Sequence, residues 1–546
     1  MKNIVLAMFL VLVTFGAAFA QFLDSDSTEV TVIVNSTIEV PGPSQALFNN
    51  PWYTCVRNFY VSTTGNDSNN GTSASTPWKT LQHADTTSRT GGDCINVAPG
   101  TYRQNLIVQH GGNAPTATGY VAYRCQTLDG CHITAPANLN YLFSAFYGGN
   151  FLIIDGFELD GTNFQVGSCF GTGDQSYGGR TGAFQAGASS HHLWIMNSIL
   201  HHCGLSGIQF ADKEYFYSIH NTSYHNSYTG PYYVQGSGIS FVAVQCIQAG
   251  GSNCYTSAIS GVPASAYSYV PSGNDTATFN QALGRYAPFH NVVAWNVVYN
   301  NRVTTNTTGY QGSGIACGSH TDGNGIIMDT FLDDPTNTYP YPYQTLVLNN
   351  VSYYNGGRGV HIFDANNVTV ANNTVFDNIT DTCITGRSTT NGELSQQGGV
   401  NNVWINNVSK PVDDIHHQIC SFVAGNGGNS ATTDINDSYQ NNVITGLNGS
   451  PCLYDNDRIY WSCSNNKCNT DPGYVNATPG AAGDVNGNSV GGTWIPGNSN
   501  FAITGSSPAN NYVVSPAPSW MPAQNVDAGA CHHSLTTCPN PGTTNY

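Results

Sequence analysis

A short motif built around asparagine recurs along this chain and constrains its fold more than any other feature. Each copy joins an apolar segment to an asparagine, with a bulky apolar residue soon after. The copies are Trp194–Leu200, Ile219–Tyr224, Val293–Tyr299, Leu346–Tyr353, Val370–Phe376 and Val403–Val408. Their shortest spacings are 24 residues, from Asn197 to Asn221, and 23 residues, from Asn350 to Asn373. Such a period is typical of one turn of a parallel β-helix, whose strands stack about 4.8 Å apart.

Two columns of polar side chains follow from this register. The motif asparagines form the first column, and the second contains His202, Asn226, Asn301, Asn355 and Asn378. Stacked amides hydrogen-bond along a coil and satisfy the backbone of its turns, so both columns are predicted to be structural. Asn350 and Asn373 would then point inward, where they could not carry glycans.

A second motif, a small or polar residue followed by glycine and an aliphatic residue, predicts the start of further strands. Its copies begin at Ser206, Ser237, Ser313, Asn324 and Arg358. Alternation then places Ile208, Phe210, Ile239, Phe241, Val360 and Ile362 inward, and Gln209, Ser240, Ile327 and His361 outward. The long intervals between Asn221 and Asn350 predict loops that leave the coil and wall a groove.

Composition agrees with an all-β coil and excludes several other classes of protein. Only 9% of the 546 residues are charged, 60 are glycine, and the formal net charge is −17. Helical bundles and disordered chains are rich in charged residues, and nucleic-acid binders need a basic surface. Repetition indicates one long domain over 56–546, including a C-terminal cap, where length alone suggests several.

The two ends of the chain predict export and a covered coil. Residues 1–20 have the charge, apolar run and small-residue cleavage site of a secretory signal, and no later segment is long enough to span a membrane. Residues 21–55 are predicted to be an extension or linker. Sixteen cysteines suit an oxidising compartment, with Cys125–Cys131 and Cys463–Cys468 close enough to form local disulfides. Thr76 and Pro77 predict a short helix over 76–84 that caps the coil with Trp78, Leu81 and Ala84.

The first and last parts of the coil resemble a known superfamily. Tyr60–Ser62, Gly65–Asp67, Pro77–Leu81 and Val97–Tyr102 resemble the entry segment of secreted right-handed β-helix proteins of the pectate-lyase superfamily. Ser507–Ala509 and Asp527–Ala530 resemble their closing segment. The resemblance implies the right-handed coil and a polysaccharide substrate. This fold carries lyases, hydrolases, epimerases and adhesins, so it does not by itself specify the reaction.

Charged residues cluster at one place, which is the predicted site. Asp322, Asn324 and Asp329 offer oxygen ligands for calcium, and Arg358 follows one turn later to neutralise a uronate carboxylate. His361 or Lys213 would act as the base that removes the proton α to this carboxylate. His320 is a further catalytic candidate. The calcium-binding, lysine-base lineage of the superfamily has an Asp-Gly turn followed by an Asp-Asp-Gly turn. Asp322-Gly323 matches the first, whereas Gly357-Arg358-Gly359 lacks the acidic pair of the second.

Three functions remain open on the sequence. The preferred one is β-elimination of a uronic-acid polymer such as pectate or alginate by a secreted monomer. A glycoside hydrolase would instead use two carboxylates among Asp322, Asp329, Asp364 and Asp377. In a non-catalytic glycan-binding protein, Asp322 would belong only to a turn. Tyr232, Tyr233 and Tyr341 are the predicted sugar-stacking residues.

Overall fold

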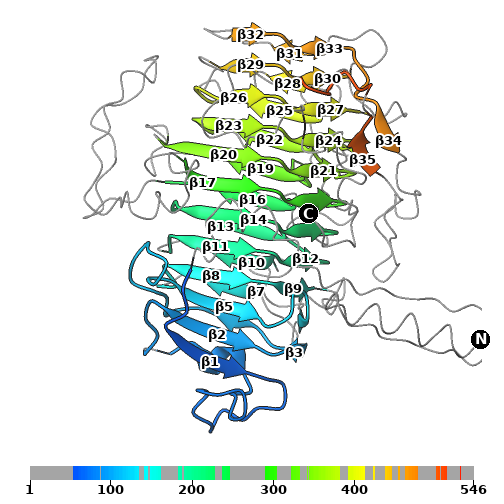
Figure 1. Ribbon diagram of the computed structural model, residues 1–546. Coiled ribbons are helices and arrows are strands. Elements are labelled where there is room, and N and C mark those ends of the chain that lie inside the picture. Colours follow the sequence, from blue (N-terminus) through cyan, green and yellow to red (C-terminus); the bar gives the residue numbers. More distant parts are fainter. Residues whose placement is uncertain are drawn as a thin grey trace, which may run out of the picture.

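The chain winds into a coil of three parallel β-sheets, shown in a computed structural model (Figure 1). The structure describes residues 53–134 without 87, 141–161 without 146–147, 182–227 without 187–189, 236–245, 289–303, 321–331, 341–381 without 342, 392–411, 422–424, 437–445, 453–455, 462–476, 500–512 without 505, and 529. Each full turn contributes one strand to every sheet, and all pairings between turns are parallel. The predicted right-handed parallel β-helix is confirmed.

The 12-stranded sheet contains the first strand of each turn. Its members are β1 (Arg57–Val61), β2 (Asp93–Val97), β5 (Val121–Cys125), β8 (Leu152–Asp155), β11 (Leu193–Met196), β14 (Phe216–Ile219), β17 (Phe289–Ala294), β20 (Gln344–Leu348), β23 (Val368–Ala371), β26 (Val403–Ile405), β29 (Ser438–Gln440) and β32 (Ser462–Ser464).

The 11-stranded sheet follows after a tight corner. It is made of β3 (Gly100–Arg103), β6 (Cys131–Thr134), β9 (Phe157–Asp160), β12 (Ile199–His201), β15 (Thr222–Tyr224), β18 (Val297–Tyr299), β21 (Val351–Tyr353), β24 (Thr374–Phe376), β27 (Val408–Lys410), β30 (Val443–Ile444) and β33 (Lys467–Cys468).

The 10-stranded sheet closes each turn. It is made of β4 (Leu106–Ile107), β7 (Tyr141–Ala145), β10 (Gly182–Ala186), β13 (Ile208–Ala211), β16 (Ile239–Val242), β19 (Ile326–Asp329), β22 (Val360–Phe363), β25 (Leu394–Gln397), β28 (Phe422–Ala424) and β31 (Leu453–Asp455).

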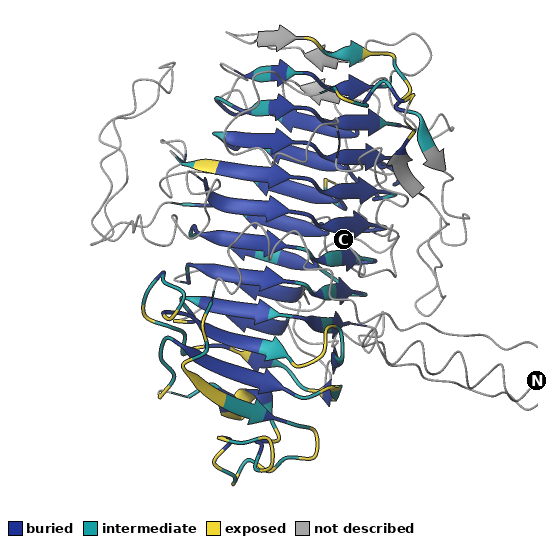
Figure 2. Ribbon diagram, viewed as in Figure 1, coloured by how far each residue is buried: buried dark blue, intermediate teal, exposed yellow. Residues whose placement is uncertain are grey.

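The core runs along the axis of the coil and is buried over most of its length (Figure 2). The six residues predicted to point inward all belong to it: Ile208, Phe210, Ile239, Phe241, Val360 and Ile362. The outward residues also share one column, because Gln209 pairs with Ser240, Ser240 with Ile327, and Ile327 with His361. Strand alternation therefore predicted both faces of this sheet correctly.

Asparagine columns stabilise two of the corners, as predicted. At the corner between the 12- and 11-stranded sheets, each amide oxygen accepts the backbone N–H of the equivalent residue one turn earlier. The Asn296 N–H donates to Asn350 Oδ1 and the Asn350 N–H to Asn373 Oδ1, both at 2.9 Å. This first column contains Asn221, Asn296, Asn350, Asn373, Asn407, Asn442 and Asn466. The second column, between the 11- and 10-stranded sheets, contains Asn226, Asn301, Asn355 and Asn378.

The predicted start of both columns was wrong by one residue. Ser198, and not Asn197, donates its backbone N–H to Asn221 Oδ1 at 3.1 Å. Likewise Cys203, and not His202, donates to Asn226 Oδ1 at 3.2 Å. Asn197 and His202 occupy the preceding corner positions, with φ angles of 50° and 57°.

The glycines of the second motif provide space for the second column. At Gly325, an added Cβ would lie 2.0 Å from Ser352 Oγ and 2.9 Å from Asn355 Nδ2. At Gly238 it would lie 2.6 Å from Asn301 Nδ2. These glycines have no positive φ, so the close packing of neighbouring side chains, and not backbone freedom, explains them.

The coil is covered at its first turn, although the helix differs from the prediction. It is α3 (Leu81–Ala84), with Thr80 as its N-cap. Trp78 precedes the helix and forms a parallel β-bridge with Val61. Trp78, Leu81 and Ala84 are nevertheless all buried against the core, as a cap requires. No helix among the described residues is long and apolar enough to cross a membrane.

Disulfides and the C-terminal segment add further contacts. The Cys125–Cys131 disulfide is confirmed, a second joins Cys55 to Cys94, and Cys468 is also disulfide-bonded. Near the C-terminus, β34 (Tyr474–Asn476) and β35 (Asn500–Ile503) pair antiparallel. Ile503 and Ala509 pack on Val408 and Val443, so this segment covers part of the 11-stranded sheet.

Candidate functional site

The predicted site residues meet around β19 and β22, which are neighbours in the 10-stranded sheet. Ile327 pairs with His361, so the predicted register of these two strands is confirmed. Asp322 lies in the turn before β19, Arg358 lies immediately before β22, and Asp329 ends β19. Side chains at both ends of these strands therefore face one patch of the sheet.

Arg358 is a buried cation at the entry to β22. Its side chain donates from Nη1 to the Thr321 carbonyl oxygen at 2.6 Å, and only 4% of the residue is exposed. Burial lowers the pKa of Arg358 to about 10, against the opposing effect of the Asp322 carboxylate. Its Nε has no hydrogen-bond partner among the described residues. The guanidinium thus stays charged at neutral pH and retains an unused donor.

Asp322 lies in the same turn and titrates near neutral pH. The Gly236 N–H donates to its Oδ2 at 2.9 Å. Burial, followed by the charge of Asp329, raises the pKa of Asp322 to about 7, outweighing the opposing effects of Gly236 and Arg358. A carboxyl group with this pKa is suited to donate or accept a proton at neutral pH.

Asp329 is a second carboxyl group with a raised pKa. Burial is the main cause, and the nearby Asp364 adds to it, so the pKa of Asp329 is about 6. Thr330 Oγ1 donates to Asp329 Oδ1 at 2.6 Å and favours the ionised form. Asp322 and Asp329 are therefore both buried carboxyl groups whose pKa values lie above the ordinary range.

His361 provides an uncharged imidazole on the same face. Its Nδ1 lies 3.3 Å from the Ser395 carbonyl oxygen, which places the proton on Nδ1 and leaves the Nε2 lone pair available. Burial, and then the charge of Arg358, lowers the pKa of His361 well below its usual value. The ring is therefore neutral at physiological pH and can accept a proton only at Nε2.

Asn324 is used by the turn, and a calcium ion held by Asp322, Asn324 and Asp329 remains a prediction. Asn324 Oδ1 accepts the Arg358 backbone N–H at 2.9 Å, and its Nδ2 donates to Ser237 Oγ at 3.3 Å. Its backbone carbonyl oxygen accepts from Gly238 at 2.8 Å. Calcium requires six to eight oxygen ligands, and here the guanidinium of Arg358 supplies positive charge beside Asp322.

Lys213 lies away from this patch. It follows β13, three strands from β22, at the opposite end of the strands from Arg358. Three strand spacings separate the two by about 14 Å or more. The nearest charge effect of Lys213 is on His191, whose pKa it helps to lower. The structure therefore does not bring Lys213 together with Asp322 and Arg358.

Tyr341 is fully buried and takes part in a polar network that the sequence did not indicate. Its hydroxyl donates to Glu214 Oε2 at 2.6 Å, and the same oxygen lies 2.7 Å from His290 Nδ1. Its ring packs edge-on against Phe331. Glu214 directly follows Lys213 in a polar turn, a context that predicted solvent exposure and gave no signal for burial. Sugar stacking by Tyr341 remains a prediction.

Three other candidates, His320, Tyr232 and Tyr233, lie outside the described residues.

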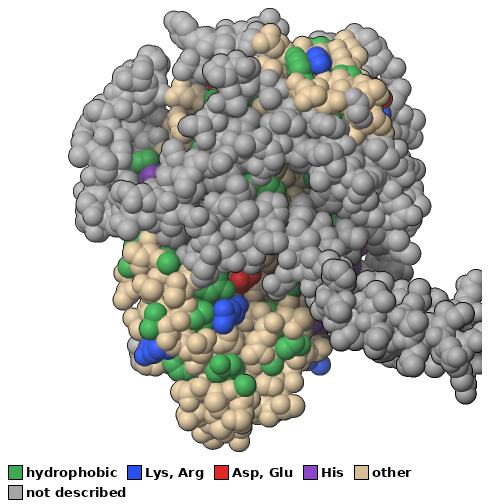
Figure 3. Space-filling view, in the orientation of Figure 1, with side chains coloured by type: hydrophobic (Ala, Val, Ile, Leu, Met, Phe, Trp, Pro, Cys, Tyr) green, Lys and Arg blue, Asp and Glu red, His purple; other side chains and the backbone are tan. Residues whose placement is uncertain are grey.

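A row of uncharged polar side chains leads along the outer face toward β19. Gln185, Gln209 and Ser240 follow one another on β10, β13 and β16. On the described part of the surface in Figure 3, Lys, Arg, Asp and Glu side chains are few. Within the row, Gln185 and Ser240 are buried, and Ser240 Oγ is hydrogen-bonded to Ser206 Oγ at 2.9 Å.

Comparison with known proteins yields low similarities. Residues 63–109 match a family described as a protein of unknown function, DUF1565. No curated protein sequence matches the chain.

Among solved structures, pectate lyase Pel9A is 17% identical, with 88% of this chain and 97% of that chain covered and a TM-score of 0.39. The A-module of the mannuronan C-5 epimerase AlgE6 from Azotobacter vinelandii is 11% identical, covering 71% and 93% with a TM-score of 0.28. The GH136 lacto-N-biosidase from Eubacterium ramulus is 12% identical, covering 76% and 67% with a TM-score of 0.36. The three stacked parallel sheets themselves show that this chain is a parallel β-helix protein.

Proposed function

We propose that this protein is an exported polysaccharide lyase that cleaves a uronic-acid polymer, such as pectate or alginate, by β-elimination. The active surface is the outer face of the 10-stranded sheet around Asp322, Arg358 and His361. One observation carries the proposal: among the described residues, the buried guanidinium of Arg358 has no hydrogen-bond partner at Nε, and it lies beside Asp322, whose pKa burial raises to about 7. A buried donor without a partner is costly, and a substrate carboxylate would satisfy it.

The reaction follows from these groups. Arg358 binds the uronate carboxylate and stabilises the negative charge that develops when the C5 proton is removed. His361 Nε2 accepts this proton, and the C5–H electron pair forms a C4–C5 double bond. The C4–O bond breaks, and protonated Asp322 gives its proton to the departing glycosidic oxygen. The products are a new chain end and an unsaturated uronide, and atoms and electrons balance without an added reactant.

Hydrolysis is the second candidate, because the charge of Asp329 acts on Asp322. The charge of Asp329 is the second-largest cause of the raised pKa of Asp322. A protonated Asp322 and an ionised Asp329 match the acid and base of a glycoside hydrolase. Lyase chemistry is preferred because it also explains the buried cation Arg358, which a neutral substrate would leave unpaired.

The test incubates the full chain with pectate, polygalacturonate, alginate and neutral glycans, each with and without a chelator. Ultraviolet absorbance of unsaturated uronides measures elimination, and a reducing-end assay measures all cleavage. The chelator arm tests the calcium hypothesis separately. Elimination on at least one uronan is expected. Cleavage without ultraviolet absorbance would favour the hydrolase, and binding without either product would favour a glycan-binding protein.

Variants then assign the roles. Arg358→Gln removes the charge and is expected to lower kcat/KM by roughly 100- to 1000-fold. His361→Gln is expected to lower kcat by roughly 100-fold or more. Lys410→Ala, which removes an exposed ion pair with Asp471 on the 11-stranded sheet, serves as the control and keeps full activity. Each variant is checked for folding by circular dichroism, and a folded, fully active Arg358→Gln protein would disprove the assignment.

A further inference from the structure

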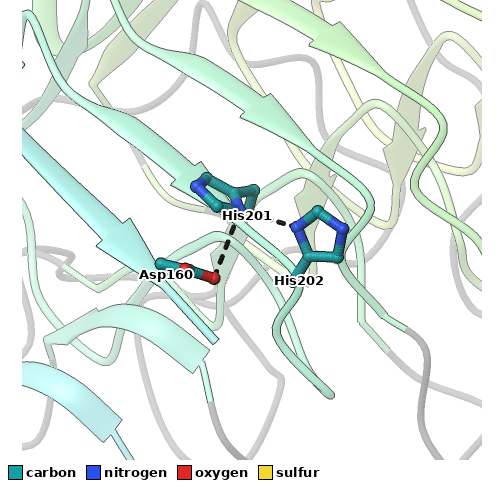
Figure 4. Close-up of side chains that lie close together, drawn as sticks. All are labelled: Asp160, His201 and His202. Carbon is teal, nitrogen blue, oxygen red and sulfur yellow. Dashed lines mark hydrogen bonds and ion pairs between the residues drawn. The ribbon is translucent and has the colours of Figure 1, made fainter. Parts of the chain in front are cut away.

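The geometry points to a zinc site on a different face of the coil, formed by Asp160, His201 and His202. Asp160 ends β9 and His201 ends β12, and the two residues are direct partners in the 11-stranded sheet. His202 follows at the corner with a φ of 57°, which turns its ring back toward His201 (Figure 4). Two neighbouring turns of the coil therefore place three potential ligands together.

The donor atoms have the spacing of a first coordination shell. His201 Nδ1 lies 2.6 Å from His202 Nδ1 and 3.5 Å from Asp160 Oδ1. The ligand atoms of all three residues lie within 4.8 Å of one another. Ligands bound at about 2.0–2.2 Å around a tetrahedral zinc ion are roughly 3.3 Å apart. Small side-chain shifts therefore suffice to coordinate one ion, with a fourth position left for water.

Two of the three ligands are also oriented by a second group through their other polar atom. His201 Nε2 lies 3.1 Å from Glu158 Oε1, and Asp160 Oδ2 lies 3.0 Å from His132 Nε2. The carboxylate of Glu158 places the His201 proton on Nε2, so the Nδ1 lone pair faces Asp160 Oδ1. This carboxylate–histidine arrangement typically supports a metal-binding imidazole. The His202 ring stacks on His225, with centroids 4.4 Å apart.

Comparison with a second histidine pair shows that the neighbouring carboxylates distinguish the His201–His202 pair. In His191–His192 the Nδ1 atoms approach to 2.7 Å, and His192 has the same φ of 57°. The neighbours of His192 are the rings of Phe151 and Tyr215, at centroid distances of 4.7 and 4.1 Å. The close approach of the rings thus belongs to the His-His corner, whereas Asp160 and Glu158 add metal-binding character only at His201–His202.

Imidazole and carboxylate ligands together suit zinc. The ion would clip β9 to β12, on the 11-stranded sheet, whereas Asp322 and Arg358 lie at the 10-stranded sheet. This site is independent of the proposed lyase activity.

The test uses the full chain after chelator treatment and dialysis. Titration with ZnCl₂ is followed by calorimetry, and bound metal is counted by mass spectrometry after gel filtration. One equivalent of zinc and a rise in Tm of several degrees are expected. Replacing zinc with cobalt should give the visible absorption of a four-coordinate site.

Asp160→Asn, which keeps the shape of the side chain, and His202→Gln are each expected to weaken zinc binding at least 10-fold. Glu158→Gln is a positioning variant with an expected loss of about 10-fold. His191→Gln with His192→Gln is the matched control and leaves the stoichiometry at one. Absence of bound zinc in the folded wild-type protein would establish a purely hydrogen-bonded cluster and overturn the proposal. Equal affinity in Asp160→Asn would overturn it as well.

Discussion

The two asparagine columns use the same hydrogen bonds but end differently. In the first column, the last amide is that of Asn466, which is partly exposed. The second column ends inside the protein, where Asn378 donates its N–H at 2.9 Å and its Nδ2 at 2.6 Å to the carboxyl group of Glu393. Glu393 is fully buried. The last member of an amide column still has a backbone N–H to satisfy, and at the buried end of the second column the carboxyl group of Glu393 accepts it.

The largest effect is expected from breaking a column in its middle. Asn373 Oδ1 accepts the N–H and the Nδ2 of Asn350, and its Nδ2 donates to the Val347 carbonyl oxygen. Asn373→Ala leaves several buried groups unsatisfied, so the free energy of unfolding should fall by roughly 3 kcal/mol. Urea denaturation followed by tyrosine and tryptophan fluorescence measures this. Asn66→Ala, at an exposed turn, is the control, and equal losses in both variants would contradict a structural column.

Removing the internal acceptor should have the next largest effect. Glu393→Ala leaves the N–H and Nδ2 of Asn378 without their partner, so we expect a loss of about 2 kcal/mol. The same denaturation experiment compares it with Asn466→Ala at the exposed end of the first column. A smaller loss in Glu393→Ala than in Asn466→Ala would show that the internal end needs no acceptor.

The internal acceptor of the second column, Glu393, should also make the stability of the protein depend on pH. Burial raises the pKa of Glu393 from 4.5 to about 8, although Asn378 opposes the shift. The folded state then binds a proton that the unfolded state has lost, so stability falls as pH rises from 4.5 to 8, by about 1 kcal/mol per pH unit. Asp322 and Asp329, with pKa values of about 7 and 6, contribute in the same direction.

Glu393→Gln removes the contribution of Glu393 to the pH dependence of stability, while the glutamine keeps an acceptor for Asn378. The slope of unfolding free energy against pH should therefore be about 1 kcal/mol per unit shallower in this variant than in the wild type. Unfolding measured from pH 5 to 8 checks this, and identical slopes would mean that Glu393 is already ionised at pH 5.

The smallest effect is expected at the start of the second column. Cys203 joins the column through its backbone N–H, and its thiol donates to the His201 carbonyl oxygen at 3.4 Å. Cys203→Ser preserves both contacts and should change the unfolding free energy by less than about 1 kcal/mol. A loss as large as that of Asn373→Ala would show that the side chain itself is a member of the column.

The error of one residue at this first turn has a physical cause. Asparagine is favoured both in the column and at the preceding corner, where the backbone is left-handed. Asn349, Asn372 and Asn406 occupy such corners with positive φ, next to the column asparagines Asn350, Asn373 and Asn407. At Asn197 only the corner residue is asparagine, so the pattern alone could not separate the two positions.

The structure brings the predicted site residues together where strand register places them, and their functional roles remain a prediction. Asp322, Arg358 and His361 come together because they belong to two consecutive strands of one sheet. Lys213 was not brought near them, because it lies at the opposite end of a strand three places away. The role of Asn324 in the turn could not be predicted from the sequence either, because its amide oxygen accepts a hydrogen bond from the Arg358 backbone N–H of the next turn.

The sequence by itself determined the parallel coil, the inward face of its strands and the asparagine columns. Each of these follows from local alternation and a repeat of about 23 residues, which neighbouring turns satisfy in the same way. Only the tertiary structure decided which distant groups meet. Tyr341 bonds Glu214 across 127 positions, and Asp160 lies beside His201 across 41. Segments of unequal length separate the turns, so the sequence spacing of two residues does not give their distance once the turns stack.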